Sequence, residues 1–280
     1  MVYENASILV TGATGNVGRL VVDSLLALGA RNVRALTVNP SRAALPPSVD
    51  VFTGYLGRPS SLRAALDGVD LMYLAPKVET CDEVCRMAAA AGVRHIVDLA
   101  GVTGSPWAPV ERAVEASGIP WTHLEAGEFM TNTEMWAPQI KTGDEVRDHA
   151  AESATAVIAL EDIADVAARV LLDGGHPGKS YELTGPVSVT RRSLVTQIGA
   201  ALGRELRYLD LPLEEVVAFY APTMGADNAD WYFRDRPLLA EHPQPPLTTV
   251  ADVLGRPATT FAEWARDHAD LFRPAENARR

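Results

Sequence analysis

Eight residues near the start of the chain, TGATGNVG at positions 11–18, carry the clearest chemical signal in the sequence. They follow a short apolar run and open an amphipathic one. Glycines at such a strand-to-helix turn allow a tight bend and bring backbone N–H groups close to a phosphate. We predict a pyrophosphate cradle in which Gly12 makes the turn, Gly15 leaves space for the ligand and Gly18 lets the helix pack on the strand. Three further residues complete this predicted cradle: Thr14, Asn16 and Val17.

The elements around the cradle alternate between short apolar runs and longer amphipathic stretches as far as residue 127. This rhythm is typical of strands joined by crossover helices in a parallel sheet. Because such crossovers are right-handed, it predicts an α/β fold with an open, doubly wound parallel sheet. The expected strands are residues 7–12, 32–38, 49–54, 70–76, 94–101 and 121–127, and the expected helices are residues 17–29, 61–68, 81–92 and 110–118.

The second half of the chain is less regular. We predict a helix at residues 161–172, a strand at 179–185 and a helix at 191–202. The last 70 or so residues show little periodicity, so we expect mostly irregular backbone there. The expected division is a dinucleotide-binding domain at residues 1–150 and a smaller, mixed substrate-binding region at residues 151–280 that is interleaved with it.

Composition excludes several classes of protein. The net charge of −11 and the lack of a long basic run argue against nucleic-acid binding. No window approaches the length of a membrane span, and no secretory leader is visible at the start, so we expect a cytoplasmic protein with a small-molecule ligand. The histidines are scattered and only Cys81 and Cys85 could supply thiolates, so we predict no metal site. The oligomeric state stays open.

The cradle TGATGNVG resembles that of the NmrA-like group of atypical short-chain dehydrogenase/reductases. The segments AALDGVDLMYL, AGVRHIV, VEASGIPWTHLEAGEF, ALEDIADVA and GKSYELTGP are similar to that group in the same order. The resemblance implies a Rossmann domain, a small carboxyl-terminal substrate region and an NAD(P) cofactor.

Four departures from the family pattern weaken what the resemblance implies. Val38 stands where the family often has an arginine for the 2′-phosphate, and residues 54–56 read Gly-Tyr-Leu instead of Gly-Asp-Leu. Residues 124–127 read Leu-Glu-Ala-Gly instead of Leu-Arg-Pro-Gly, and Trp107 replaces a common histidine. Loss of cofactor binding therefore stays open as an alternative.

Cofactor choice depends on charge after the cradle. NAD sites place an acid about 20 residues beyond the glycines, whereas NADP sites supply a cation. No acid lies between Asp23 and Asp50, but Arg31, Arg34 and Arg42 do. This favours NADP(H) over NAD(H). The expected cofactor contacts beyond the cradle are Asn39, Ser41, Arg42, Tyr55, Leu56, Ala75, Pro76 and Ala100.

Ligands of open α/β sheets bind beyond the carboxyl ends of the strands. Lys77 follows the fourth strand and is a candidate catalytic cation, while the match Tyr73–Lys77 to a catalytic Tyr/Lys pair fails on the intervening Pro76. Glu128 would serve as an acid or base if desolvation raised its pKa. The expected substrate-binding residues, from the loops after the fifth and sixth strands, are Thr103, Trp107, Phe129, Asn132 and Trp136.

Two further side chains have two interpretations each. Asp98 is either a site residue or a buried mid-strand carboxylate with a partner. Cys81 and Cys85 begin a helix whose Thr80 and Glu83 have capping-box spacing, so Cys81 is either an activated thiol or an ordinary reduced one.

The leading functional hypothesis is an NAD(P)H-dependent oxidoreductase that acts on an apolar or aromatic carbonyl, enone or quinone-like molecule. Two alternatives remain at this stage. One is a non-redox isomerase, cyclase or lyase that kept the fold. The other is a nucleotide-sensing regulator without catalysis.

Overall fold

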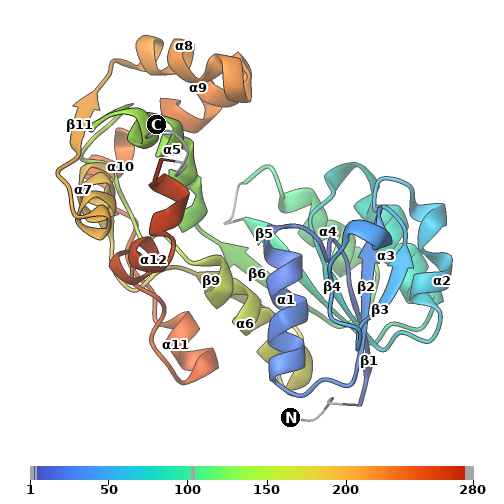
Figure 1. Ribbon diagram of the computed structural model, residues 1–280. Coiled ribbons are helices and arrows are strands. Elements are labelled where there is room, and N and C mark those ends of the chain that lie inside the picture. Colours follow the sequence, from blue (N-terminus) through green and yellow to red (C-terminus); the bar gives the residue numbers. More distant parts are fainter. Residues whose placement is uncertain (1–2, 4, 102–104, 275–280) are drawn as a thin grey trace. The chain divides into compact units, whose positions relative to one another are not determined.

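The computed structural model divides the chain into two compact units (Figure 1). It describes residues 3, 5–101 and 105–274. The first unit comprises Met1–Gly127, Leu160–Leu183 and Thr248–Pro257, and the second comprises Glu128–Ala159, Thr184–Leu247 and Ala258–Arg280.

A seven-stranded, fully parallel sheet forms the centre of the first unit, with the strand order β3-β2-β1-β4-β5-β6-β9. The predicted α/β fold with a doubly wound parallel sheet is therefore confirmed. The strands are β1 (Ser7–Val10), β2 (Asn32–Thr37), β3 (Asp50–Thr53), β4 (Leu71–Leu74), β5 (His95–Gly101), β6 (Trp121–Ala126) and β9 (Lys179–Leu183). The order reverses between β1 and β4, which opens a crevice at their carboxyl ends.

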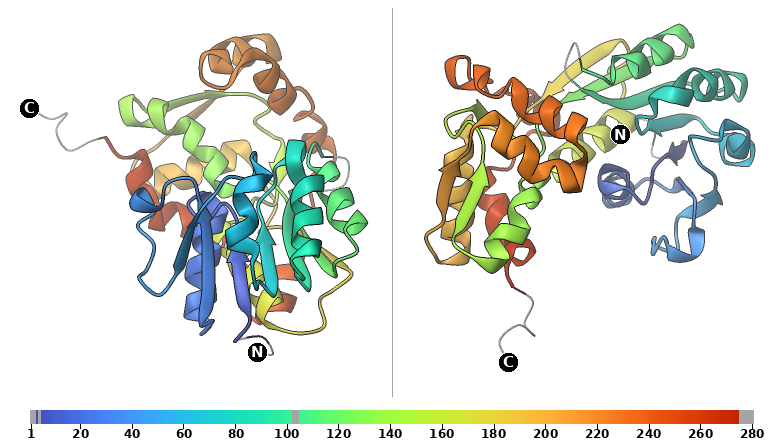
Figure 2. Two further views of the ribbon diagram at one scale, coloured as in Figure 1. Left: turned by 90° about the vertical axis from the view of Figure 1, so that its right-hand side faces the viewer. Right: turned by 90° about the horizontal axis from the view of Figure 1, so that it is seen from above.

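Helices cover both faces of this sheet (Figures 1 and 2). Helix α1 (Asn16–Ala27) packs against α6 (Leu160–Leu172), and α3 (Cys81–Ala90) packs between α2 (Arg63–Leu66) and α4 (Ala108–Ala116) on the other face. The central strands are mostly apolar because both faces are buried, and the polar exceptions include Asp98 of β5 and His123 of β6. All four residues of β4 and the first six of β5 are buried.

The observed division of the chain differs from the expected one. The chain leaves the first unit after Gly127 rather than at residue 150, and it returns twice. Helix α6 and strand β9 pack on and extend the parallel sheet, and α11 (Thr249–Leu254) packs against α6. The sequence predicts the helix at 161–172 and the strand at 179–185 but does not assign them to the parallel sheet, because β9 is mostly exposed and lies at the sheet edge, where an apolar run is not required.

The second unit is built around buried aromatic rings, among them Trp136, Phe233 and Trp264. The expectation of irregular backbone in its last part was wrong, because α8 and α9 form a pair of packed helices (Figure 1). Its elements are η4 (Met130–Trp136), α5 (Ala137–Thr142), β7 (Glu145–Asp148), β8 (Ala154–Thr155), β10 (Val189–Thr190), α7 (Arg191–Leu202), β11 (Arg207–Asp210), α8 (Leu213–Met224), α9 (Ala226–Arg234), α10 (Leu238–Glu241), α12 (Phe261–Asp267) and η5 (Ala269–Phe272).

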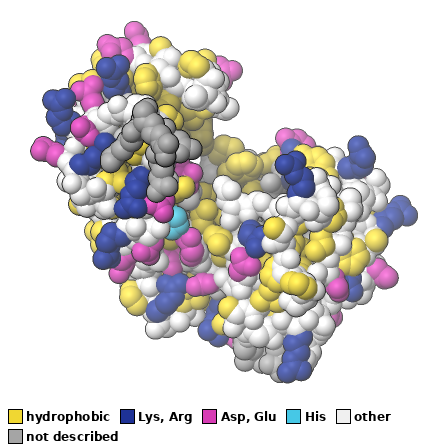
Figure 3. Space-filling model, viewed as in Figure 1, with side chains coloured by type: hydrophobic (Ala, Val, Ile, Leu, Met, Phe, Trp, Pro, Cys, Tyr) yellow, Lys and Arg dark blue, Asp and Glu magenta, His cyan; other side chains and the backbone are white. Residues whose placement is uncertain are grey.

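Charged side chains of both signs are interspersed on the face seen in Figure 3, without a continuous basic surface. No helix in the described part of the chain combines the length and apolar character needed to cross a membrane.

Candidate functional site

The glycine turn after β1 has the backbone geometry that its sequence predicts. Gly12 has φ +60°, and a Cβ there would lie 2.9 Å from Cβ of Ala75. A Cβ on Gly18 would lie 2.3 Å from the carbonyl oxygen of Gly12, so helix α1 can approach the turn only with glycine at this position. Gly15 is exposed and adopts ordinary extended backbone, so a ligand can reach its backbone atoms.

The N-terminus of α1 is open for an anion. Gly15 is its N-cap and no side chain caps the helix, and its first turn contains no acidic residue. Thr14 and Asn16 are exposed, whereas the side chain of Val17 is buried in the core. Uncapped N–H groups and the positive end of the helix dipole stabilise a pyrophosphate. Only the backbone of Val17 is therefore available for this role.

Thr11 links the two strands that flank the crevice, a role that sequence analysis did not predict. Its buried hydroxyl donates to the carbonyl oxygen of Tyr73 (3.0 Å) and accepts from the amide of Ala75 (2.8 Å). These bonds tie the end of β1 to the end of β4. They fix Ala75 and Pro76, both half-buried, beside the glycine turn.

Of the three arginines predicted to favour NADP(H), only Arg42 lies beyond the carboxyl end of β2. Arg31 precedes β2 at the opposite edge of the sheet. Arg34 is a structural residue, because its guanidinium donates to the carbonyl oxygens of Ala65 and Asp67 and stacks 5.5 Å from the centre of Phe52. Arg42 is exposed on the short helix η1 (Pro40–Arg42) beyond the carboxyl end of β2.

The neighbours of Arg42 form a small polar surface. The Ser41 hydroxyl donates to Oδ1 of Asn39 (2.8 Å), and both residues are exposed. The hydroxyls of Thr14 and Thr37 are 3.2 Å apart, which links the glycine turn to the end of β2. Val38 is 65% exposed and leaves this edge without an acid.

Lys77 is half-buried after β4 and forms a 2.7 Å ion pair with Glu79. The hydrogen bond to Glu79 raises the pKa of Lys77, so its ammonium stays charged. Tyr73 is fully buried and its hydroxyl has no hydrogen-bond partner; burial, reinforced by Asp98, raises its pKa. A catalytic Tyr73/Lys77 pair is therefore excluded.

Glu128, in the second unit, is not poised as an acid or base. Its carboxylate receives hydrogen bonds from Arg236 (2.7 and 3.2 Å), Tyr232 (2.8 Å) and Thr155 (3.0 Å), and Arg191 lies 3.5 Å away. Burial opposes ionisation, but the two guanidinium groups dominate and lower the pKa of Glu128 to about 2. The condition for an acid or base, a pKa raised by desolvation, is therefore not met, because two arginines surround this carboxylate.

The expected substrate-binding residues divide into three groups. Trp136 was wrongly assigned: it is fully buried in the core of the second unit, where its Nε1 donates to Asp148 (3.0 Å) and Arg191 stacks on its ring. Trp107 is 43% exposed at the start of α4, and Phe129 and Asn132 are half-buried. Thr103 lies outside the described residues. Ala100, a predicted cofactor contact, is buried at the end of β5.

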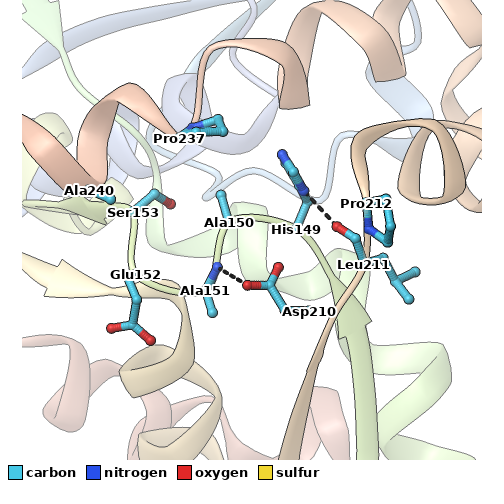
Figure 4. A pocket seen from close by; sticks show the side chains of 10 residues that line it. All are labelled: His149, Ala150, Ala151, Glu152, Ser153, Asp210, Leu211, Pro212, Pro237 and Ala240. Carbon is cyan, nitrogen blue, oxygen red and sulfur yellow. Dashed lines mark hydrogen bonds between the residues drawn. The ribbon is translucent and has the colours of Figure 1, made fainter.

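A pocket of about 460 Å³ lies within the second unit, where β7 and β11 end (Figure 4). His149 donates from Nδ1 to the carbonyl oxygen of Leu211 (2.7 Å), and the amide of Ala151 donates to Asp210 (3.1 Å). The pocket contains none of the residues that the sequence indicated for substrate.

Both cysteines are buried. Desolvation raises the pKa of Cys81, and it raises that of Cys85 to about 12, so an activated thiol at the helix start is excluded. The expected capping box is absent, since Thr80 donates instead to the carbonyl oxygen of Leu56 (2.9 Å). Asp98 is a buried mid-strand carboxylate paired with His123. The described residues contain no cluster of metal-binding side chains.

With this geometry established, comparison with known proteins decides the family. Residues 12–174, more than half of the chain, match the family described as NAD(P)H-binding. The chain belongs to this family. The matched segment begins at the glycine turn and includes every strand of the sheet except β1 and β9.

Curated relatives of this NAD(P)H-binding protein span almost its whole length. A (4-alkanoyl-5-oxo-2,5-dihydrofuran-3-yl)methyl phosphate reductase from Streptomyces griseus is 35% identical and covers 95% of this chain and 99% of its own. An NAD(P)H azoreductase from Xenophilus azovorans is 33% identical with the same coverage of both chains. These matches identify the chain as an NAD(P)H-dependent oxidoreductase of the NmrA-like, atypical short-chain dehydrogenase/reductase type.

Solved structures agree with the fold. An NADPH-dependent quinone oxidoreductase from Escherichia coli superimposes with a TM-score of 0.80 at 28% identity and covers 93% of this chain and 99% of its own. A Citrobacter triphenylmethane reductase complexed with NADP(H) has a TM-score of 0.82 at 22% identity, covering 94% of this chain and all of its own, and it supports the fold alone.

Proposed function

We propose that the protein is an NADPH-dependent reductase of planar, apolar, conjugated acceptors such as enones, quinones and related carbonyl compounds. The observation that carries the proposal is the open glycine cradle at residues 12–18, which keeps its turn, its close helix packing and an uncapped helix N-terminus. Side chains around the cradle depart from the family pattern, but the backbone that would hold a pyrophosphate fits that group.

NADPH is preferred over NADH in this proposal because of charge at the end of β2. NAD sites need a carboxylate there for the ribose hydroxyls, and this edge presents Val38 and Asn39 instead. Arg42 is exposed nearby, and its guanidinium has no hydrogen bond or ion pair with any described residue. A free guanidinium is suited to a phosphate, with which it forms charge-assisted hydrogen bonds.

The substrate class is inferred from the relatives. Their names refer to an oxo-dihydrofuran that bears an alkanoyl group and a methyl phosphate, to azo compounds and to quinones. Each of these has a conjugated, electron-poor double bond in a planar frame. The planar, conjugated part of such a molecule needs apolar, flat contacts.

Three side chains are candidate substrate contacts, one in the first unit and two in the second. Trp107 presents an indole that is 43% exposed at the start of α4 in the first unit. Phe129 and Asn132 begin the second unit and keep part of their surfaces open. An aromatic ring that stacks on the substrate contributes binding free energy beyond the apolar area that it buries.

A reduced nicotinamide supplies a hydride when it is bound. The task of the chain is to fix the substrate and to stabilise negative charge on its oxygen, since positioning and fixed charge account for much of the rate in such reactions. Lys77 fits the second task as a permanent cation, because its raised pKa makes it a poor proton donor near neutral pH. The proton of the product then comes from water.

The test combines binding with turnover. NADPH, NADH and NADP⁺ are titrated against the fluorescence of the five tryptophans. The loss of nicotinamide absorbance is then followed over a panel of enones, quinones, azo compounds and small polar ketones. Tight NADPH binding with turnover of the planar acceptors is the expected result. Binding without turnover would favour a sensor, and absence of binding would favour a non-redox enzyme.

A further inference from the structure

Tyr55, at the carboxyl end of β3, presents an aromatic ring with an open surface from a hydrogen-bonded turn. It is 52% exposed. Its amide donates to the hydroxyl of Ser61 (3.0 Å), and its carbonyl oxygen accepts from the amide of Arg58 (2.8 Å). The backbone on both sides of the ring is therefore closed into a tight turn, which limits where the ring can lie.

The ring of Tyr55 packs against the backbone of Gly57. A Cβ at Gly57 would be 2.4 Å from Cε1, 2.9 Å from Cζ and 3.1 Å from the hydroxyl oxygen of Tyr55. The phenol end of the ring thus lies directly against the glycine backbone, and any Cβ at position 57 would displace it. One part of the ring is covered by Gly57 while about half of the residue stays open.

The position of this ring relative to the cradle follows from the sheet. Strands β2 and β3 are paired through Thr37 and Thr53, and the amide of Gly54 donates to the carbonyl oxygen of Thr37 (2.9 Å). Tyr55 is therefore next to the end of β2, on the side of the cradle where a dinucleotide places its adenosine half.

A second loop closes against the same turn. Thr80 donates to the carbonyl oxygen of Leu56 (2.9 Å), so the segment after β4 is tied to the segment after β3. Lys77 belongs to that segment and is close enough to Tyr55 to interact with it electrostatically. The loops that follow β2, β3 and β4 therefore meet near Tyr55.

We propose that Tyr55, supported by Gly57, is the stacking platform for the adenine of the cofactor. This inference rests on the proposed function. In the family pattern an aspartate stands at this position, and here the adenine is held through its face by an aromatic ring. A ring that already packs on one side suits this task, because base stacking on an aromatic side chain costs less entropy when its freedom is restricted.

The experiment measures equilibrium binding of NADPH and of adenosine 2′,5′-bisphosphate, which has the adenine but no nicotinamide. Three variants are compared with the wild type: Tyr55→Ala, Tyr55→Phe and Gly57→Ala. Tyr55→Ala should raise both dissociation constants at least tenfold, equal to about 1.4 kcal/mol. Tyr55→Phe keeps the ring and should stay within twofold. Gly57→Ala displaces the ring and should resemble Tyr55→Ala.

The outcomes separate this inference from the function beneath it. If wild-type protein binds neither ligand, the proposed function fails. If wild-type protein binds both and Tyr55→Ala changes neither affinity, or strengthens them because the ring had blocked the adenine, only the platform is overturned. Thermal unfolding of each variant checks the fold, and Tyr55→Ala is expected to stay folded because the residue is half exposed.

Discussion

Asp98 accepts a 2.7 Å hydrogen bond from Nδ1 of His123 between two directly paired positions of β5 and β6, and both side chains are buried. Nε2 of His123 points toward Glu115 (3.7 Å), and Glu111 is a further acid near it. Burial opposes the charge on His123, but Asp98, Glu111 and Glu115 together raise its pKa above the usual value. Burial also raises the pKa of Asp98 and of Glu111.

This cluster should make stability decrease as the pH rises. A histidine whose pKa is raised by folding stabilises the folded state fully below about pH 6.5, and this contribution is lost as the pH rises through the raised value. The raised pKa values of Asp98 and Glu111 act in the same direction. We expect the thermal midpoint to fall from pH 6.5 upward, and the double substitution Asp98→Asn, His123→Gln should flatten that decline.

His95 provides the matched control for this measurement. It is buried and bonded to Thr122, and desolvation lowers its pKa to about 4, the opposite direction. Its neutral form is favoured in the folded protein, so it reduces stability as the pH falls from about 6.5 toward 4. His95→Gln should leave the profile above pH 6.5 unchanged. An equal flattening by His95→Gln would refute the assignment to His123.

Replacing two glycines of the cradle by alanine should have different effects, one on NADPH affinity and the other on stability. A Cβ on Gly15 would be 3.2 Å from the carbonyl oxygen of Gly12, so Gly15→Ala should cost less than about 1 kcal/mol in stability but weaken NADPH at least tenfold. Gly18→Ala places its Cβ 2.3 Å from the same oxygen and should lose about 1–3 kcal/mol of stability or more. Unchanged NADPH affinity in Gly15→Ala would remove the cradle as the binding site.

Arg42→Ala should weaken NADPH by about 1.5–3 kcal/mol, typical of a hydrogen bond to a charged group, and leave NADH nearly unchanged. Arg31→Ala is the control, because Arg31 is also exposed but precedes β2 at the opposite edge of the sheet. Fluorescence titration of both cofactors decides the matter. Equal losses for NADPH and NADH would show that Arg42 acts on a shared part of the ligand or on folding.

Glu128→Gln should reduce stability rather than change the pH dependence of catalysis. The substitution leaves Arg236 and Arg191, both buried, without this carboxylate, and breaking a buried ion pair costs about 3–5 kcal/mol. Urea unfolding measures the loss. If the variant is as stable as the wild type but its rate no longer depends on pH, Glu128 is an acid or base after all.

Trp107→Ala should raise KM for a planar acceptor at least tenfold, because the exposed indole is then no longer available to stack on it. The affinity for NADPH should stay within twofold, because Trp107 is not part of the cradle at residues 11–18. Trp107→Phe is the conservative variant and should recover most of the loss. A small polar substrate with an unaltered KM in Trp107→Ala would contradict the planar class.

The sequence predicted most of the first unit because its information is local. Six of the strands follow from apolar runs, and the cradle follows from three glycines at one turn. The second unit depends on distant partners. Arg191 and Arg236 meet Glu128 from 63 and 108 residues away, so no local pattern could indicate that its pKa would fall. Trp136 was misplaced for the same reason, since Asp148 and Arg191 enclose its ring.

The returning segments of the first unit have a consequence for recombination. Arg256, from the stretch 248–257, donates to Asp162 (2.7 Å) and Asp165 (2.6 Å) on α6, and Ser24 of α1 donates to the same Asp165 (2.7 Å). The first unit, which contains the glycine cradle, thus depends on residues near the carboxyl terminus of the chain. The first unit therefore cannot be transferred as one continuous segment. A fragment that stops before residue 248 would leave the buried Asp162 without the guanidinium of Arg256. To exchange the second unit between relatives, its separate segments must be grafted into a first unit that keeps residues 248–257.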